Sequence, residues 1–550
     1  MILGTGYPTF ASASLTFHRS LARGSGDPRQ RRRTILYYQK KTILLHHNPN
    51  ITEMKKLLII SVLIIVSSLI SGAQDRRLPA DTAIITKHST TINGEKLSYT
   101  ATTGTQPVYI DDEEVAYLYY TYYTRDVQGN RDNRPLIISF NGGPGAASVW
   151  MHMAYTGPKI VKIDDEGYPV QPYGVRDNPY SILDIADILY VNPVNTGYSR
   201  MVKDKDGKMP DGKLFFGINA DIEYLAAWIS DFLSRNNRWL SPKYIIGESY
   251  GGTRVSGLAY ELQSRNWVYL NGVIMVSPAD YKIFESDVPI SSGLNLPYYT
   301  ATAWYHNMLN PELQQKDLLE ILPEAEDFTI NILIPALTQG GFISDEEKEK
   351  VAERMSYYSG ISKKAILQHN LDLPTRFFWK ELLRDKSGQM IGRLDSRYIG
   401  IDKTEAGISP DFSIEMSTWN HAFTPAINYY TREVLGFRTD LKYNMSGNVR
   451  PWDRTNNNVR ENLRLAMAAN PFLNVMFQGG YYDGACTYFA SKYTMWQIDP
   501  SGKMKDRLSF KGYRSGHMMY LRREDLKQAN DDLREFIRNT QPEGPAKYQR

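Results

Sequence analysis

The chain has 550 residues, of which 42% are hydrophobic and 23% are charged, a composition typical of a globular enzyme with a large core. Its net charge of +4 comes from the N-terminal end, where basic residues up to Lys56 outnumber the acidic ones and leave the rest of the chain mildly acidic. This distribution argues against a nucleic-acid-binding protein.

Residues 54–73 have the layout of a secretory signal peptide. Lys55 and Lys56 precede an apolar run that begins at Leu57, and the small residues Ser71 and Ala73 suit a cleavage site. The run is shorter than the ~20 residues of a membrane-spanning helix, which disfavours the alternative of a retained anchor. We therefore predict export to a periplasm or to the exterior, with no stable membrane insertion after cleavage.

Residues 1–53 precede this segment, although a signal peptide should begin the chain. We interpret them as a mis-assigned extension with Met54 as the true start, and an organelle-targeting extension is the alternative. Cys486 is the only cysteine, which excludes an intrachain disulfide. An exported enzyme without disulfides fits a bacterial periplasm or exterior better than a eukaryotic secretory route.

The body of the chain alternates apolar segments with segments of helical period. Residues 78–134 are rich in Thr and Tyr with alternating apolar positions, which predicts antiparallel strands. The later predicted strands are short and continuously apolar: residues 135–140, 185–192, 243–247, 272–277 and 472–478. The predicted helices among them cover residues 219–233 and 253–265. This pattern predicts a mostly parallel sheet covered by helices on both faces.

Residues 281–421 break this alternation, because they are charged and helical in pattern without a clear buried strand. We interpret them as an inserted helical cap between the two parts of the core, residues 78–280 and 422–538. The alternative is a group of surface helices with no role at the functional site. The polar tail, residues 539–550, is predicted to be flexible.

Ser249 lies in a Gly-Glu-Ser-Tyr-Gly motif between a predicted buried strand and a predicted helix. Such a strained turn exposes the serine hydroxyl at a helix N-terminus, and Gly247 and Gly251 permit it because they have no Cβ atom. The motif also occurs by chance as a glycine-rich turn, but its position between strand and helix favours a nucleophile.

An activated serine needs a base and an acid, which in α/β-hydrolases follow it in the order acid, then histidine. His517 follows a strand-like segment and a glycine turn near the end of the chain, whereas the other downstream histidines fall in or beside the predicted cap. Asp483 leaves a buried strand through a Gly-Gly turn. We predict that Ser249 attacks a carbonyl, His517 transfers the proton, and Asp483 orients the imidazole.

The sequence Asn141-Gly-Gly-Pro-Gly follows an earlier predicted strand, where hydrolases of this type have an oxyanion loop. The N–H of Gly143 can face a substrate oxygen without obstruction, and the N–H of Tyr250 is the second expected donor. An ordinary glycine turn is the alternative.

Together these blocks, with Cys486 three residues after Asp483 and Gly516-His-Met, resemble the serine carboxypeptidase family, peptidase family S10. We expect an α/β-hydrolase fold with an inserted helical cap and no metal or cofactor. The resemblance adds the substrate, because it implies an enzyme that acts on peptide or protein C-termini. It also implies that Asn141, Gly142 and Glu248 hold the substrate's terminal carboxylate. Two facing carboxyls require one to be protonated, so the resemblance implies a preference for acidic pH.

The sequence departs from the family pattern at several positions. Ser139 stands where a Trp is frequent, Ala146 where a Cys is usual, and Asn192 where an Asp is common. Met519 and Tyr520 replace the usual Val-Pro. An acyltransferase or esterase on the same scaffold stays open as the alternative function, because the acyl-enzyme is common to both and only the acceptor or substrate differs. A catalytically inactive binding protein is a third reading.

Overall fold

The computed structural model describes residues 78–541 apart from residues 128, 130, 280–288 and 456–458. The predicted signal peptide, the extension before it and most of the predicted tail lie outside the described residues. In the part of the chain that the structure describes, no helix is both long enough and apolar enough to cross a lipid bilayer.

Ten strands of the described residues form one sheet in the order β1-β2-β3-β7-β4-β9-β10-β13-β14, with β8 beside β3. Neighbours from β1 to β7 are antiparallel, and those from β7 to β14 are parallel. The strands are β1 Ala83–Ile92, β2 Glu95–Ile110, β3 Glu113–Arg125, β4 Leu136–Phe140, β7 Asp187–Val191, β8 Arg200–Met201, β9 Lys243–Glu248, β10 Gly272–Val276, β13 Asn474–Gly480 and β14 Leu508–Tyr513. This order confirms the predicted antiparallel start and parallel centre.

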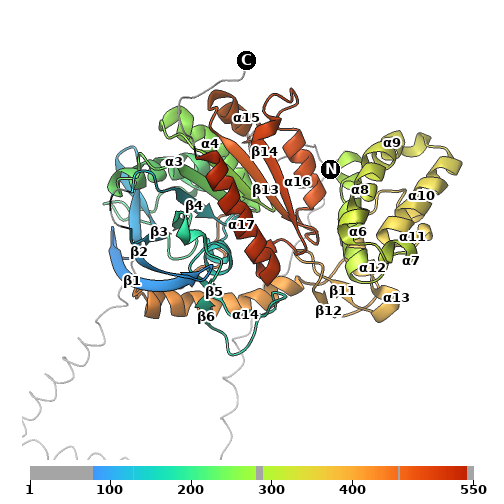
Figure 1. The fold of residues 1–550 in the computed structure, drawn as a ribbon, viewed down its shortest axis with the longest axis horizontal. Coiled ribbons are helices and arrows are strands. Elements are labelled where there is room, and N and C mark those ends of the chain that lie inside the picture. Colours follow the sequence, from blue (N-terminus) through green and yellow to red (C-terminus); the bar gives the residue numbers. More distant parts are fainter. Residues whose placement is uncertain (1–77, 128, 130, 280–288, 456–458, 542–550) are drawn as a thin grey trace, which may run out of the picture. The chain divides into compact units, whose positions relative to one another are not determined.

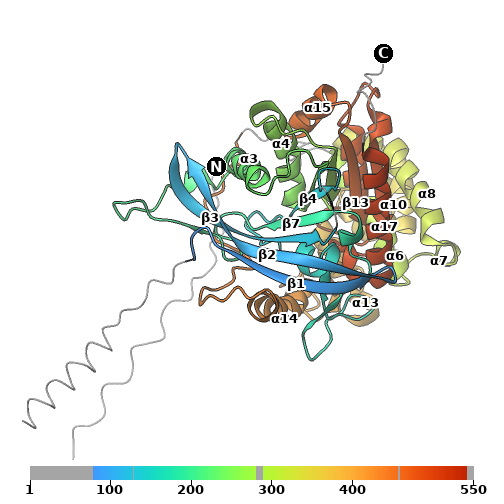
Figure 2. The same cartoon turned by 60° about the vertical axis from the view of Figure 1, so that its left-hand side comes forward.

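Helices cover both faces of the sheet, as Figures 1 and 2 show. Side chains alternate across a strand, so Val273 and Met275 of β10 pack with the helices of one face, whereas Ile274 and Val276 pack with those of the other. The first face carries α3 Ile218–Arg235, α4 Tyr250–Arg265 and α15 Val459–Ala469; the second carries α14 Ile414–Tyr429 and α17 Arg523–Thr540. Burial on both faces explains why these strands are continuously apolar. The predicted α/β-hydrolase fold is confirmed.

Short helices between β10 and α14 bury their apolar side chains mostly in a cluster of their own. They are α5 Pro289–Gly293, α6 Leu296–Tyr305, α7 Pro311–Gln314, α8 Leu318–Phe328, α9 Ile334–Gln339, α10 Asp345–Ser359, α11 Lys363–Gln368, α12 Thr375–Glu381 and α13 Arg384–Ser387. The strands β11 Met390–Ile391 and β12 Ile399–Gly400 follow. The boundary predicted at residue 421 falls inside α14, whose buried side chains belong to the core cluster.

The remaining regular elements are short. The described residues also include the strands β5 Lys159–Val161 and β6 Val175–Asp177, α16 Tyr488–Trp496, the 3-10 turns η2 Ile182–Asp184, η3 Gly212–Leu214, η5 Gly340–Phe342, η7 Lys505–Arg507 and η8 Met519–Leu521, and the π turns η1 Met151–Tyr155, η4 Thr329–Leu333 and η6 Tyr430–Val434. The loops after β4, β9, β13 and β14 begin at the carboxyl ends of parallel strands and therefore meet at one edge of the sheet.

Candidate active site

Ser249 occupies a strained turn between β9 and α4. Its φ of 59° and ψ of −125° lie in a region that side-chain-bearing residues rarely adopt. A Cβ on Gly247 would stand 2.1 Å from the Gly251 carbonyl oxygen, so this turn needs glycine at that position. Ser249 is half-buried between the buried residues Glu248 and Tyr250 and precedes the first residue of α4.

The loop after β4 packs directly against this turn. A Cβ on Gly142 would stand 2.5 Å from both the Glu248 carbonyl oxygen and the Tyr250 nitrogen. Gly143 follows with a φ of 106°, which favours glycine. The loop after β4 therefore lies against the backbone on either side of Ser249.

A buried ion pair contacts the loop after β4. Arg254 of α4 donates from Nε to Asp221 Oδ2 of α3 at 2.7 Å and from Nη1 to the Asn141 carbonyl oxygen at 2.6 Å. The Tyr250 hydroxyl also donates to Asp221 Oδ2, at 3.2 Å. Because the pair is almost completely buried, the position of the Asn141 backbone depends on both charges.

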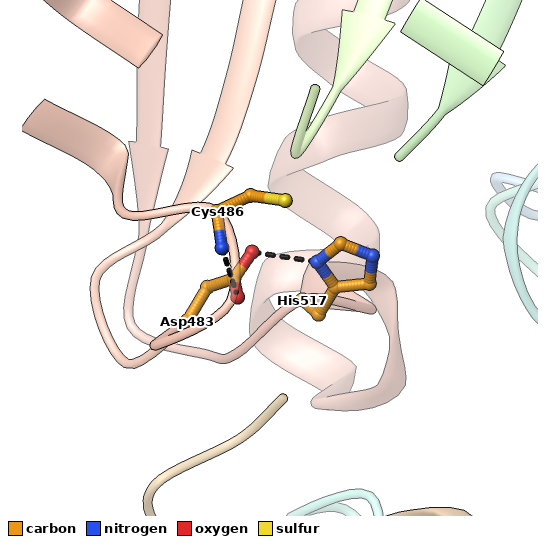
Figure 3. Close-up of side chains that lie close together, drawn as sticks. All are labelled: Asp483, Cys486 and His517. Carbon is orange, nitrogen blue, oxygen red and sulfur yellow. Dashed lines mark hydrogen bonds and ion pairs between the residues drawn. The ribbon is translucent and has the colours of Figure 1, made fainter. Parts of the chain in front are cut away.

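Asp483 and His517 meet across two loops, and Figure 3 shows their side chains facing one another. His517 Nδ1 lies 2.7 Å from Asp483 Oδ2, and Asp483 Oδ1 accepts hydrogen bonds from the backbone nitrogens of Ala485 and Cys486 at 2.9 and 3.0 Å. Burial alone would lower the pKa of His517, but the charge and hydrogen bond of Asp483 raise it well above its usual value. The carboxylate therefore orients the ring and stabilises its charged form.

The two loops touch because glycines stand at their closest approach. A Cβ on Gly480 would stand 2.1 Å from the Gly516 carbonyl oxygen, and one on Gly516 would stand 2.4 Å from Asp395 Cβ. The segment between β11 and β12 also contacts the histidine directly, since the His517 nitrogen donates to the Leu394 carbonyl oxygen at 2.6 Å. The region inserted between β10 and α14 thus supports the loop that carries His517.

Glu248 is a buried carboxyl directly before Ser249. Its Oε2 accepts hydrogen bonds from Asn141 Nδ2 at 3.0 Å and from the Tyr520 hydroxyl, and it is 3% exposed. Burial raises the pKa of Glu248 to about 7, although His517, Tyr520 and Asn141 favour the ionised form. A carboxyl next to the turn can therefore be neutral at mildly acidic pH.

The structure brings the predicted site residues to one place but does not join all of them. His517 Nε2, the ring nitrogen that does not bind Asp483, lies 4.0 Å from Oε1 of Glu248, the residue before Ser249. Among the described residues, no hydrogen bond connects the Ser249 hydroxyl with His517. Hydrogen bonds of this kind are often long in the absence of substrate and shorten when it binds.

Asp483, Cys486 and His517 each offer an atom that could bind a metal, and these atoms lie within 4.8 Å of one another. Asp483 and His517 already share a hydrogen bond of 2.7 Å, which a bound ion would have to break. Burial raises the pKa of the Cys486 thiol, which keeps it a weak ligand at neutral pH. The donor set therefore suits proton transfer better than metal binding.

Sequence reasoning missed three contributors to the site: Tyr520, Arg254 and Asp221. In the sequence Tyr520 stands out only as a departure from the family pattern, because its contact with Glu248 joins positions 272 residues apart. The contact of Arg254 with Asp221 joins two helices and has no local sequence signature.

Comparison with known protein families finds one family that matches most of the chain. The family described as serine carboxypeptidase, Peptidase_S10, matches residues 102–507. Serine carboxypeptidase-like 8 of Arabidopsis thaliana is 29% identical over 198 residues, which are 34% of this chain and 42% of that protein. The pheromone-processing carboxypeptidase KEX1 of Saccharomyces cerevisiae is 30% identical over 162 residues, or 28% of this chain and 20% of that protein.

These alignments span less than half of the length of either relative. Among solved structures, that of the prohormone-processing carboxypeptidase Kex1(delta)p from Saccharomyces cerevisiae covers 80% of this chain and 92% of its own, with 14% identity and a TM-score of 0.48.

Proposed function

The chain belongs to the serine carboxypeptidase family, and we propose that it is a serine-type carboxypeptidase that removes residues from the C-termini of peptides or proteins. The observation that carries this proposal is the neutralisable carboxyl of Glu248 beside the strained Ser249 turn, within 4.0 Å of His517. A hydrolase of internal bonds or simple esters has no need of such a group there.

In the proposed mechanism the Ser249 hydroxyl attacks the carbonyl carbon of the last peptide bond while His517 Nε2 accepts its proton. Asp483 holds the other ring nitrogen and stabilises the imidazolium. The tetrahedral intermediate then collapses, the C–N bond breaks, and the departing amine takes the proton from His517. Water hydrolyses the resulting acyl-enzyme by the same proton transfers in reverse.

Two backbone donors are proposed to stabilise the oxyanion. We assign this role to the N–H groups of Gly143 and Tyr250, and the close approach of Gly142 to the Tyr250 nitrogen supports the assignment. One such donor typically contributes about 3 kcal/mol to transition-state stabilisation.

Asn141, Gly142 and Glu248 are proposed to bind the free carboxylate of the substrate. Below about pH 7 a protonated Glu248 can donate a hydrogen bond to this carboxylate, whereas above it the ionised group repels the substrate. We therefore expect kcat/KM for free-acid peptides to fall above about pH 7, and this alkaline limb belongs to Glu248.

The test is a time course of amino acids released from a mixed set of peptides between pH 4 and 7, with Ser249→Ala as the inactive control. Peptides with an amidated C-terminus should be cleaved much more slowly. Equal cleavage of both sets would show that a free C-terminus is not recognised and would refute the proposal. Ester hydrolysis or acyl transfer without peptide cleavage would favour the esterase or acyltransferase. Failure of Ser249 to react with a fluorophosphonate would refute the proposed mechanism and favour an inactive binding protein.

Export is a further part of the proposal, carried by the sequence of residues 54–73, which lie outside the described residues. Mature protein recovered from the periplasm or medium should begin near residue 74, after cleavage following Ala73. Material that retains the apolar run and stays with membranes would instead indicate an anchor. We also propose that the helical region between β10 and α14 is a cap on the core, which moves the predicted boundary at residue 421 to the start of α14.

A further inference from the structure

Tyr520 is a completely buried side chain in the 3-10 turn η8, and its hydroxyl donates a hydrogen bond to Glu248 Oε2. The ring stacks on that of Tyr155, with centroids 4.8 Å apart and planes 9° apart. Tyr155 is in turn held by a 2.7 Å hydrogen bond from its hydroxyl to Gln478 Oε1 of β13. The orientation of the Tyr520 hydroxyl is therefore set by the core of the sheet.

Asn141 donates to the same carboxyl oxygen of Glu248. Its amide orientation is determined, because Asn141 Oδ1 accepts a hydrogen bond from the Met151 nitrogen at 3.0 Å and so must face away from Glu248. Two donors thus converge on Oε2. The other oxygen, Oε1, is the one that lies 4.0 Å from His517 Nε2.

We propose that Tyr520 is a positioning residue which, together with Asn141, occupies Oε2 of Glu248 and leaves Oε1 as the oxygen that carries the exchangeable proton and meets the substrate's terminal carboxylate. This inference rests on the proposed carboxypeptidase function. The proposal adds that the preference for a free over an amidated C-terminus depends on the Tyr520 phenol in the core as well as on the loop after β4.

The groups that face Glu248 act on its charge in known directions. His517, Tyr520 and Asn141 favour the carboxylate, whereas burial and the negative charge of Asp483 oppose it. Burial and the charge of Glu248 raise the pKa of Tyr520 well above its usual value, so the phenol stays a hydrogen-bond donor across the working pH range. Removing the phenol hydroxyl must therefore raise the pKa of Glu248.

The experiment compares kcat/KM for a peptide with a free C-terminus and for the same peptide amidated, between pH 5 and 9. The ratio of the two values cancels the titration of His517, which is common to both substrates. In the wild type the ratio should fall above about pH 7. In Tyr520→Phe the midpoint of this fall should move upward by about one pH unit, as expected for the loss of one hydrogen bond to a charged group.

A second variant gives the opposite expectation without changing the shape of the side chain. 3-Fluorotyrosine at position 520 is a more acidic phenol and a stronger donor, so the midpoint should move to lower pH. The matched control is Tyr429→Phe, at a tyrosine that is 53% exposed, and should leave the midpoint unchanged. In Glu248→Gln the ratio should be independent of pH, and adding Tyr520→Phe should change nothing further.

The outcomes separate the two levels of the proposal. A wild-type ratio close to one at every pH would refute the proposed carboxypeptidase function. A wild-type ratio that falls near pH 7 while neither Tyr520 variant moves the midpoint would refute the role of Tyr520 alone. If Tyr520→Phe does not fold, as judged by loss of fluorophosphonate labelling, the 3-fluorotyrosine variant decides the question.

Discussion

Replacing Arg254 by Met should destabilise the protein more than any change at its surface, because it leaves the Asp221 carboxylate buried without its counter-charge. Arg254 contacts Asp221 through Nε at 2.7 Å and Nη2 at 3.4 Å, and both side chains are almost completely buried. Breaking a buried pair on one side typically costs about 3–5 kcal/mol in the free energy of unfolding. The same change removes the 2.6 Å hydrogen bond to the Asn141 carbonyl oxygen.

The loss should also depend on pH. Burial raises the pKa of Asp221 and Arg254 opposes that shift, so the folded Arg254→Met variant binds a proton at Asp221 more tightly than the unfolded chain does. The free energy of unfolding of the variant therefore falls as pH rises through the interval between the unfolded and the folded pKa. We expect a larger loss of stability at pH 8 than at pH 5.

Urea unfolding of wild type and variants at these two pH values measures the effect. The matched control is Arg265→Met in the same helix, where an exposed arginine pairs with Glu261, and its change should stay within about 0.5 kcal/mol. Adding Asp221→Asn to Arg254→Met removes the buried charge and should abolish the pH dependence. An equal loss at both pH values, or a loss no larger than that of the control, would refute this reasoning.

Three further changes test other parts of the site. Asp483→Asn should lower kcat for ester and peptide substrates by about 10⁴-fold without large loss of stability, and a loss below tenfold would contradict its orienting role. Gly480→Ala should lower both thermal stability and activity, because the added Cβ would stand 2.1 Å from the Gly516 carbonyl oxygen, whereas Gly174→Ala, with open space around it, should change neither. Glu248→Gln should extend cleavage of free-acid peptides above pH 7; an unchanged alkaline limb in the kcat/KM profile would assign that limb to another group.

The positions of Ser249, Asp483 and His517 could be inferred from local signals because each follows a strand or a glycine-bearing turn in a fixed chain order. Two glycines precede Asp483 in the sequence and form the end of β13 rather than a turn, and the structure places the Asp483 carboxylate 2.7 Å from His517 Nδ1. The support of the histidine loop by the segment after β11 could not be inferred. This contact depends on how the inserted region packs against the core. The sequence of that region has no regular apolar period that would predict the packing.

The type of fold could be inferred from the sequence, because alternating and helical patterns of apolar residues depend on neighbouring residues and reflect which side of each element faces the core. The glycine-lined turn at Ser249 could be inferred in the same way. The electrostatics of Glu248 could not, since its contacts with Asn141 and Tyr520 join residues 107 and 272 positions away in the chain. Hydrogen bonds of this kind depend on the packing of the whole sheet, and no local pattern specifies them.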